Sequence, residues 1–212
     1  MQSLETIVYL HGFASGPGSR KAQYFRERFL ESGHSLAIPD LAEGDFENLT
    51  ITGQLRVVER LVGDRPAILI GSSMGGYLTA LYAARHPAVC RVVLLAPAFG
   101  FAARWPESLG ADLMAEWEQT GWRTVPHYGD KIERRLNYKI IEDGRKFEEY
   151  PDVRQRALLF HGRNDTVVPP SLSQTFAASR PNVTLEMLDS DHELTDVLPY
   201  LWERTRQFVL NP

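Results

Sequence analysis

The chain has 212 residues, of which 43% are hydrophobic, and a formal net charge of −4 at pH 7. This length and composition are typical of one globular domain with a sizeable core, and the acidic balance argues against nucleic acid as the main partner. The one cysteine, Cys90, rules out an internal disulfide bond and is expected to be a small buried side chain beside a strand. The sequence shows no apolar run near the ~20 residues that span a bilayer, no secretion signal at its start and no Cys and His cluster with metal-ligand spacing. We therefore expect a cytoplasmic protein that uses no metal or cofactor.

Short apolar runs alternate with helix-like segments in the first hundred residues. Strands are expected at 6–10, 35–38, 67–70 and 91–96, and helices at 19–33, 55–62 and 73–85. The first of these helices is indicated by apolar residues at helical spacing, which are Ala22, Phe25, Phe29 and Leu30. Residues 41–53 are polar and are expected to form a loop.

The pattern changes between Phe99 and Asp152, where three of the four tryptophans lie and no strand-like run is evident. Apolar spacing predicts two short helices, one through Leu109, Leu113 and Trp117 and one through Ile132, Leu136 and Ile140. An ordinary connection has about 2–6 residues, so we expect residues 99–152 to be an inserted helical cap over an apolar substrate pocket. The alternative is an ordinary connection with packed aromatic residues. The charges at 131–135 and 145–146 are expected to form a solvated face, with a grip on a phosphate-bearing substrate as the alternative.

The alternation of strands and helices resumes after this segment. Strands are expected at 157–160 and 183–188, and helices at 171–178 and 199–210. Strands that alternate with helices build a mostly parallel sheet with helices on both faces. We therefore expect an α/β fold and a single domain over residues 1–212. Ligands of such sheets bind beyond the carboxyl ends of the strands.

A G-x-S-x-G pattern, formed by Gly71, Ser73 and Gly75, joins the strand at 67–70 to the helix that follows. Between a buried strand and an Ala-rich helix, this pattern is typical of a nucleophile elbow, in which the central serine is exposed on a strained turn. A Cβ at either flanking position would collide with the neighbouring strand or helix, which explains the two glycines. No Gly-Lys-Ser/Thr or G-x-G-x-x-G pattern is present here, so a phosphate-binding or dinucleotide turn is disfavoured. The pattern assigns the nucleophile to Ser73, and Ser72 is expected to pack against the sheet.

A serine nucleophile needs a base, and that base needs an orienting acid. Among the six histidines, only His192 lies on a loop after the last expected strand; His11 and His161 precede glycines at strand ends and are interpreted as structural. Asp165 follows the strand at 157–160 and completes the order Ser, Asp, His. The structural alternative for Asp165 is a helix cap or a turn. The competing acids, which precede that strand or lie too close to the histidine in sequence, are Asp152, Asp189 and Asp191.

An acyl-transfer site also needs two convergent N–H donors for the oxyanion. The backbone N–H of Met74, the residue after the nucleophile, is the first candidate. The second is expected from the loop at residues 11–18, where Phe13 follows His11 and Gly12. We therefore expect the oxyanion hole to consist of the Phe13 and Met74 amides, with the Phe13 ring as a wall of the acyl pocket.

The motifs together resemble those of serine hydrolases with the α/β-hydrolase fold. They are YLHGF (9–13), GSSMGG (71–76), HGRND-TVVP (161–169) and DH (191–192). The opening YLHGFASGPGSRKA and the GSSMGGY elbow are similar to the small bacterial YqiA-like esterases. The stretch EWEQTGW (116–122) and the tail are similar to the α/β-hydrolase-domain group that contains the mitochondrial palmitoyl-protein thioesterase. The first strand already ends in HGF, so this resemblance implies a shortened sheet of about six strands.

The leading hypothesis is a serine hydrolase that cleaves carboxylic esters or thioesters through an acyl-enzyme, with a small-molecule substrate that has an apolar acyl part. C–C bond hydrolysis and acyl transfer use the same groups and are the enzymatic alternatives. A non-catalytic binding module with this fold is the alternative from another class. Its usual signature is a broken triad, which this sequence does not show.

Overall fold

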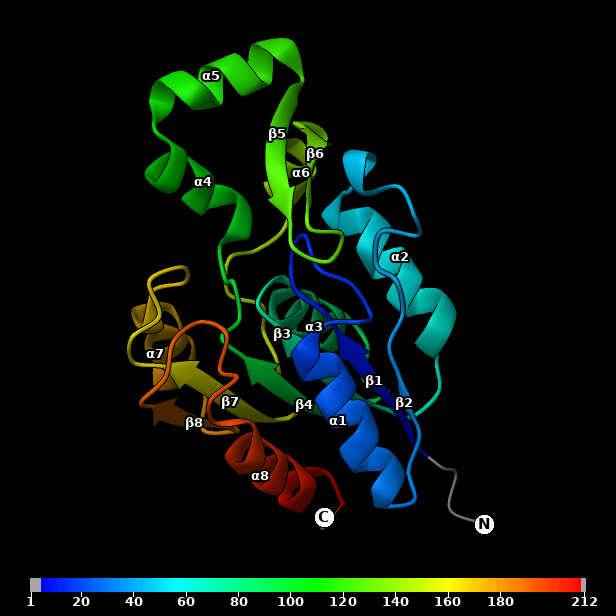
Figure 1. Cartoon of the computed structure of the whole chain (residues 1–212). Coiled ribbons are helices and arrows are strands. Elements are labelled where there is room, and N and C mark those ends of the chain that lie inside the picture. Colours follow the sequence, from blue (N-terminus) through cyan, green and yellow to red (C-terminus); the bar gives the residue numbers. More distant parts are fainter. Residues whose placement is uncertain (1–4, 211–212) are drawn as a thin grey trace.

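The structure is a computed structural model that describes residues 5–210. Residues 1–4 and 211–212 lie outside the described part. The expected domain over 1–212 and the start that was searched for a secretion signal both include some of these residues. Six strands form one sheet in the order β2-β1-β3-β4-β7-β8 (Figure 1). They are β1 (Thr6–Leu10), β2 (Leu36–Ala37), β3 (Ala67–Ser72), β4 (Val89–Leu95), β7 (Arg156–Gly162) and β8 (Val183–Leu188). All neighbours in this sheet are parallel, which confirms the expected α/β fold with about six strands.

Side chains alternate between the two faces of the sheet along each strand, and helices cover both faces, so both are buried. One face packs against α2 (Ile51–Val62), α3 (Met74–Arg85) and α7 (Pro170–Ala178). The opposite face packs against α1 (Arg20–Glu31) and α8 (Leu198–Leu210). The strand residues on the α2 face include Val8, Leu69, Leu94 and Leu159, and those on the α1 face include Ile7, Ile70, Val93 and Phe160. The sheet therefore holds the carboxyl ends of its strands on a rigid two-sided core.

The helix expected from residue 19 is present as α1, which buries Ala22, Phe25 and Phe29 and leaves Leu30 70% exposed. Two local expectations were wrong. Cys90 is exposed, since it lies near the start of β4 rather than within the buried part of that strand. Residues 41–53 are not all loop: η1 (Phe46–Asn48) is a short 3₁₀-helix and α2 already begins at Ile51. The Oγ1 of Thr50 caps α2 by accepting the Gly53 N–H at 2.9 Å, a helix start that the sequence interpretation missed.

The segment between β4 and β7 contains α4 (Phe101–Leu109), α5 (Ala111–Thr120), the antiparallel hairpin of β5 (Trp122–His127) and β6 (Ile132–Asn137), and α6 (Lys139–Gly144). The expectation of a strand-free segment was therefore wrong. The helix predicted through Leu109 and Trp117 is two helices, because Gly110 separates them with a positive φ of 86°. The helix predicted through Ile132 and Leu136 is strand β6.

Residues 99–152, here called the insertion, stand over the carboxyl edge of the sheet in Figure 1. Trp117 anchors its interior: the indole is 1% exposed, and its Nε1–H donates to the Leu136 carbonyl at 3.0 Å. The carboxylate of Asp143 joins α6 to the start of α2 by accepting the Thr52 N–H at 2.7 Å and the Thr52 hydroxyl at 2.8 Å. These contacts place the insertion at the edge where parallel sheets bind ligands. Among residues 5–210, no helix combines the length and the apolar character needed to cross a bilayer.

Candidate active site

Ser73 lies on a tight turn between β3 and α3. Its backbone has φ 54° and ψ −118°, a conformation that non-glycine residues rarely adopt. The backbone around this turn is closely packed. A Cβ on Gly71 would lie 2.2 Å from the Gly75 carbonyl oxygen, and a Cβ on Gly75 would lie 2.0 Å from the Leu10 carbonyl oxygen. The Ser73 N–H also donates to the Leu95 carbonyl at 2.8 Å. The packed backbone therefore fixes the position of the Ser73 hydroxyl.

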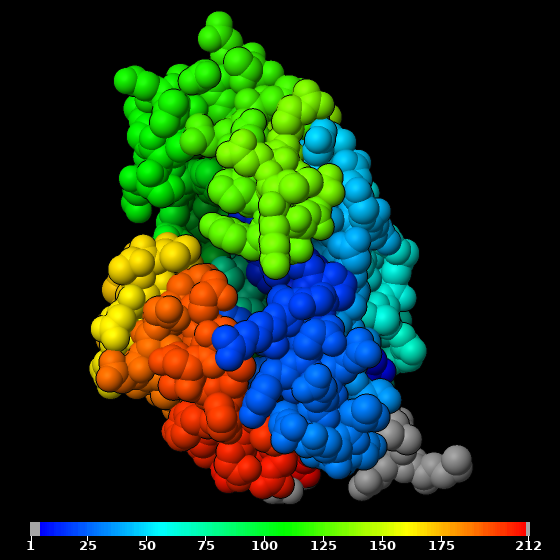
Figure 2. Space-filling model, viewed as in Figure 1, coloured from blue at the N-terminus to red at the C-terminus, as the bar shows by residue number. Residues whose placement is uncertain are grey.

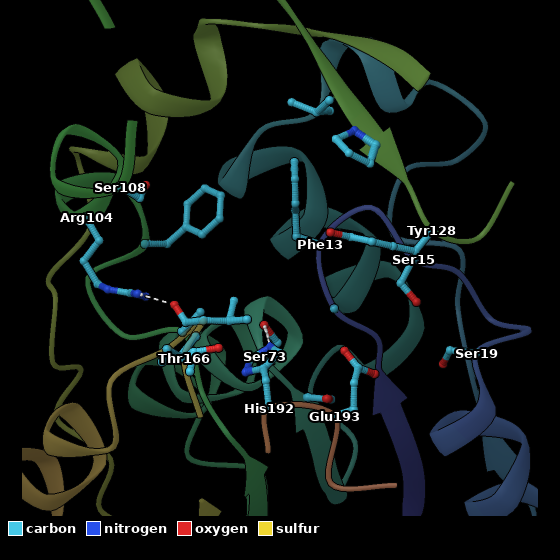
Figure 3. A pocket seen from close by; sticks show the side chains of 18 of the residues that line it. Phe13, Ser15, Ser19, Ser73, Arg104, Ser108, Tyr128, Thr166, His192 and Glu193 are labelled. Atoms are coloured by element: carbon cyan, nitrogen blue, oxygen red, sulfur yellow. Dashed lines mark hydrogen bonds between the residues drawn. The ribbon is translucent and has the colours of Figure 1, made fainter. Parts of the chain in front are cut away.

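The side chains of Ser73, His192 and Asp165 meet in one hydrogen-bonded row. Nε2 of His192 is 3.0 Å from Oγ of Ser73, and Nδ1 of His192 is 2.7 Å from Oδ2 of Asp165. The carboxylate can only accept, so Nδ1 carries the proton and Nε2 of the neutral ring is free to accept from the serine. Figure 3 shows the Ser73 and His192 side chains directed toward one another at the base of the cavity. The structure thus brings together the three residues that the sequence selected from different loops.

The Asp165 carboxylate is completely buried and fully engaged in hydrogen bonds. Its Oδ1 accepts the N–H groups of Val167 at 2.9 Å and Val168 at 2.8 Å, while Oδ2 faces both His161 and His192. Burial alone would raise the pKa of Asp165, but the hydrogen bonds from His161, His192 and Val168 outweigh it and hold the pKa well below its usual range. Asp165 is therefore an ionised carboxylate that orients the imidazole of His192.

His161 supports the site in a way that the sequence interpretation missed. It was interpreted as a structural residue, and its side chain is indeed fully buried, but Nε2 lies 3.0 Å from Oδ2 of Asp165. The same nitrogen lies 2.9 Å from the Val168 carbonyl, while Nδ1 is 2.7 Å from the Ser173 hydroxyl. Both groups facing Nε2 are acceptors, so Nε2 carries the proton and the serine donates to Nδ1. The signal was a histidine at the end of β7, four residues before Asp165.

The competing acids are engaged elsewhere. Asp152 pairs with Arg154 and is 73% exposed at its side chain. Asp189 accepts from Asn164, and Asp191 accepts the backbone N–H groups of its own loop at Glu193 and Leu194. These contacts remove the three aspartates from the position that Asp165 occupies.

The amides proposed for the oxyanion hole belong to segments that adjoin Ser73. Met74 is the first residue of α3, where backbone N–H groups have no partner within the helix. Phe13 follows Gly12, whose position lies so close that an added Cβ would be 3.4 Å from Cβ of Ser73. Neither the Phe13 nor the Met74 N–H donates a backbone hydrogen bond to another residue in the described range. Both donors are thus available, and their role as an oxyanion hole remains a prediction.

A cavity of about 600 Å³ opens above Ser73 and His192, between the insertion and the loops at the carboxyl edge of the sheet. Figure 2 shows the corresponding hollow between the green insertion and the blue and orange segments below it. The Phe13 ring packs against Phe101 and Trp105 of the insertion, with centroid distances of 5.9 and 6.1 Å. The apolar side chains that line this part of the cavity are Phe13, Phe101, Trp105, Leu109 and Val125.

Comparisons with known proteins agree with this geometry. The chain is 25% identical over 206 residues to the mitochondrial palmitoyl-protein thioesterase ABHD10 of Bos taurus, covering 90% of this chain and 67% of the relative. It is 29% identical over 105 residues to the monoacylglycerol lipase ABHD6 of Bos taurus, covering 44% of this chain and only 30% of the lipase. The solved structure of alpha/beta hydrolase domain-containing protein 10 from mouse superposes with a TM-score of 0.82 at 23% identity, covering 99% of this chain and 91% of that structure. This likeness shows the α/β-hydrolase fold.

The first of these relatives is mitochondrial, so the expected cytoplasmic location of this chain remains a prediction. The family comparison covers almost the whole chain, from residue 6 to residue 209. It confirms the resemblance to the YqiA-like proteins that the opening loop and the elbow suggested. The chain is therefore a member of the uncharacterised protein family UPF0227, with the α/β-hydrolase fold.

Proposed function

We propose that this protein is a serine hydrolase that cleaves carboxylic ester or thioester bonds through an acyl-enzyme on Ser73. The observation that carries the proposal is the hydrogen-bonded row of Ser73, His192 and Asp165 on a strained elbow. The names of the thioesterase and lipase relatives support acyl substrates, although each name describes only that relative. In this proposal, the three residues form a catalytic triad.

The first step is acylation. Nε2 of His192 takes the proton of the Ser73 hydroxyl while Oγ attacks the acyl carbonyl. The carbonyl oxygen becomes an oxyanion, which accepts hydrogen bonds from the Phe13 and Met74 N–H groups. Removing one such donor typically raises the barrier by about 3–4 kcal/mol. His192 then gives its proton to the leaving alcohol or thiol, and the acyl group stays on Ser73.

Deacylation repeats these roles with water. Nε2 of His192 takes a proton from water while the water oxygen attacks the acyl carbonyl. The bond between the acyl carbon and Oγ of Ser73 then breaks, His192 returns the proton to Oγ, and the acid is released. Asp165 remains ionised throughout, because its hydrogen bonds favour the charged form. It therefore stabilises the imidazolium in both steps.

We propose that the insertion is a cap that holds the acyl part of the substrate. The support is its position over Ser73 and the aromatic wall of Phe13, Phe101 and Trp105. A wall of this kind stabilises an apolar acyl chain by removing it from water, at about 0.8 kcal/mol per buried methylene.

The test uses a fluorophosphonate probe and 4-nitrophenyl butyrate with wild type, Ser73→Ala and Ser72→Ala. We expect labelling and turnover in wild type and in Ser72→Ala, and neither in Ser73→Ala. The Ser72 variant is the matched control, since it removes the neighbouring hydroxyl on the same turn. Undiminished turnover by Ser73→Ala, or an unlabelled wild type that hydrolyses no ester or thioester, would contradict the proposal.

A further inference from the structure

The cavity beside Ser73 has a positively charged wall, although the chain as a whole carries a net charge of −4. Four cationic side chains line it: Arg20, Lys21, Arg104 and Arg123. Among the described lining residues, Glu193 is the one carboxylate, and its side chain is 68% exposed to solvent. Lys21 is accounted for, because its ammonium donates to the Glu193 backbone carbonyl and so holds the loop that carries His192. Arg20 is exposed to solvent and needs no partner, so the half-buried Arg104 and Arg123 remain to be explained.

Arg104 extends from α4 into the space between the insertion and the segment that follows β7 (Figure 3). One nitrogen of its guanidinium donates to the Val167 carbonyl at 2.7 Å. Within residues 5–210, this is the one hydrogen bond of the guanidinium, which forms no ion pair within 4.0 Å. A guanidinium has five N–H donors, so several of them face the cavity without a protein partner.

Arg123 on β5 also lines the cavity and, among the residues that the structure describes, also lacks a charged partner. Its side chain is half-buried, and in the described part of the chain it forms no hydrogen bond or ion pair. The outward-facing arginines of the same hairpin differ: Arg134 pairs with Asp130 at 2.6 Å and Arg135 with Glu47 at 3.3 Å. Carboxylates of the hairpin turn and of η1 therefore pair with these two arginines, while Arg123, which lines the cavity, has none within the described range.

A partly buried cation without a counter-ion is costly, because it has lost water and gained no charged partner. Burial lowers the pKa of Arg104 more than the charges of Glu107 and Asp165 raise it, so neither carboxylate compensates for the loss of hydration. The free-energy penalty of such a cation is modest only if its remaining N–H donors face a space that an anion can enter. A planar guanidinium is also well suited to the two oxygens of a carboxylate or phosphate group.

We infer that the substrate of the Ser73 site carries an anionic group, on its acyl part or on its leaving group, and that Arg104 and Arg123 bind this group. The inference rests on the proposed hydrolase function and names its substrate class. The exposed charges at 131–135 and 145–146 do not line the cavity, so they take no part in this binding.

Two matched ester pairs test the inference and distinguish the two locations of the charge. Mono-4-nitrophenyl glutarate and its methyl ester differ by one carboxylate on the acyl part. The compounds 3-acetoxybenzoate and methyl 3-acetoxybenzoate differ by one carboxylate on the leaving group. We expect wild type to favour the anionic member of at least one pair in kcat/KM, and this preference to shrink as ionic strength rises.

Arg104→Met and Arg123→Met should each lower kcat/KM for the favoured anionic ester by about tenfold, mainly through KM, because each removes charged hydrogen bonds to it. Turnover of the neutral partner should stay within about twofold. Arg154→Met is the matched control: it removes the same charge from a side chain that is 86% exposed and does not line the cavity. We expect it to leave both members unchanged.

The inference is overturned if wild type favours neither anionic ester, or if Arg104→Met lowers both members of a pair equally. The second result would mean that Arg104 only fastens the insertion to the segment after β7. In either case, turnover of the neutral esters that depends on Ser73 would leave the proposed hydrolase function intact. Loss of all ester turnover in wild type would instead contradict the proposed function itself.

Discussion

Nε2 of His161 lies 3.0 Å from Oδ2 of Asp165, the same oxygen that accepts a hydrogen bond from His192. His161 touches no substrate space, since its side chain is fully buried beneath the acid. It is therefore a positioning residue: it holds the carboxylate in the rotamer that His192 needs. The Nε2 proton is shared with the Val168 carbonyl at 2.9 Å, so the contact should contribute less than the about 1.5–3 kcal/mol typical of a full hydrogen bond to a charged group.

We expect His161→Leu to lower kcat for 4-nitrophenyl butyrate by up to about tenfold. His161→Gln should recover much of this loss, because its amide nitrogen can reach the same carboxylate oxygen. The acidic limb of the kcat/KM profile should also move to higher pH in His161→Leu, since a carboxylate with one donor fewer attracts the imidazolium proton more strongly. Equal defects in the two variants, with an unmoved pH profile, would show that His161 only fills space.

The strained backbone of Ser73 predicts a conflict between stability and activity. Glycine adopts a positive φ without steric cost, whereas alanine keeps the strain of the serine backbone. We expect Ser73→Gly to be more stable than Ser73→Ala by about 1 kcal/mol, which corresponds to about 2–4 °C in Tm for a domain of this size. Both variants should be inactive. Thermal unfolding checks the difference, and equal midpoints would show that the turn is not strained in solution.

The Phe13 side chain and the Phe13 amide are expected to have separable roles. In Phe13→Ala the N–H remains, so hydrolysis of 4-nitrophenyl acetate should change little. The ring that packs on Phe101 and Trp105 is lost, so the acyl wall loses apolar surface. We expect the ratio of kcat/KM for the octanoate ester over the acetate ester to fall about tenfold. A uniform loss for both esters would indicate that the substitution displaces the amide as well.

The elements that touch substrate space were largely predictable from the sequence. The elbow has a local steric cause, since Gly71 and Gly75 are required wherever a strand turns this sharply into a helix. His192 and Asp165 were found because parallel strands bring their carboxyl ends to one edge, so loops far apart in sequence meet there. Both inferences depend on backbone geometry that a short motif determines.

The insertion was less predictable, because tertiary contacts decide its structure. Ile132, Leu136 and Ile140 have the spacing of a helix, yet residues at i and i+4 also share one face of a strand, and Ile132 is 53% exposed. Strand β6 forms because it pairs with β5 and packs on η1, neither of which is visible in its own sequence. For the same reason, nothing local distinguishes Arg104 and Arg123 from other surface arginines, and only the fold turns them toward the cavity.

The attachment of the insertion to α2 should weaken at low pH, because it depends on the carboxylate of Asp143. Burial raises the pKa of Asp143, but the hydrogen bonds from the Thr52 N–H, the Thr52 hydroxyl and Lys146 outweigh this and lower it below the usual value. A lowered pKa in the folded state means that ionised Asp143 stabilises the fold. This contribution is complete above the unfolded pKa of about 3.9 and is lost as the pH falls through the folded pKa.

We therefore expect Asp143→Asn to lower the free energy of unfolding by about 2 kcal/mol near neutral pH. The two Thr52 donors contact different carboxylate oxygens, and in asparagine one of these is replaced by an NH2 group, which cannot accept. Below about pH 4, wild type should lose this advantage, so the two unfolding curves should converge. Urea unfolding at several pH values measures the difference. Asp152→Asn is the matched control, since its carboxylate is 73% exposed and pairs only with Arg154. A difference between wild type and Asp143→Asn that stays constant from neutral to acidic pH would contradict the assignment of the stabilisation to the ionised carboxylate.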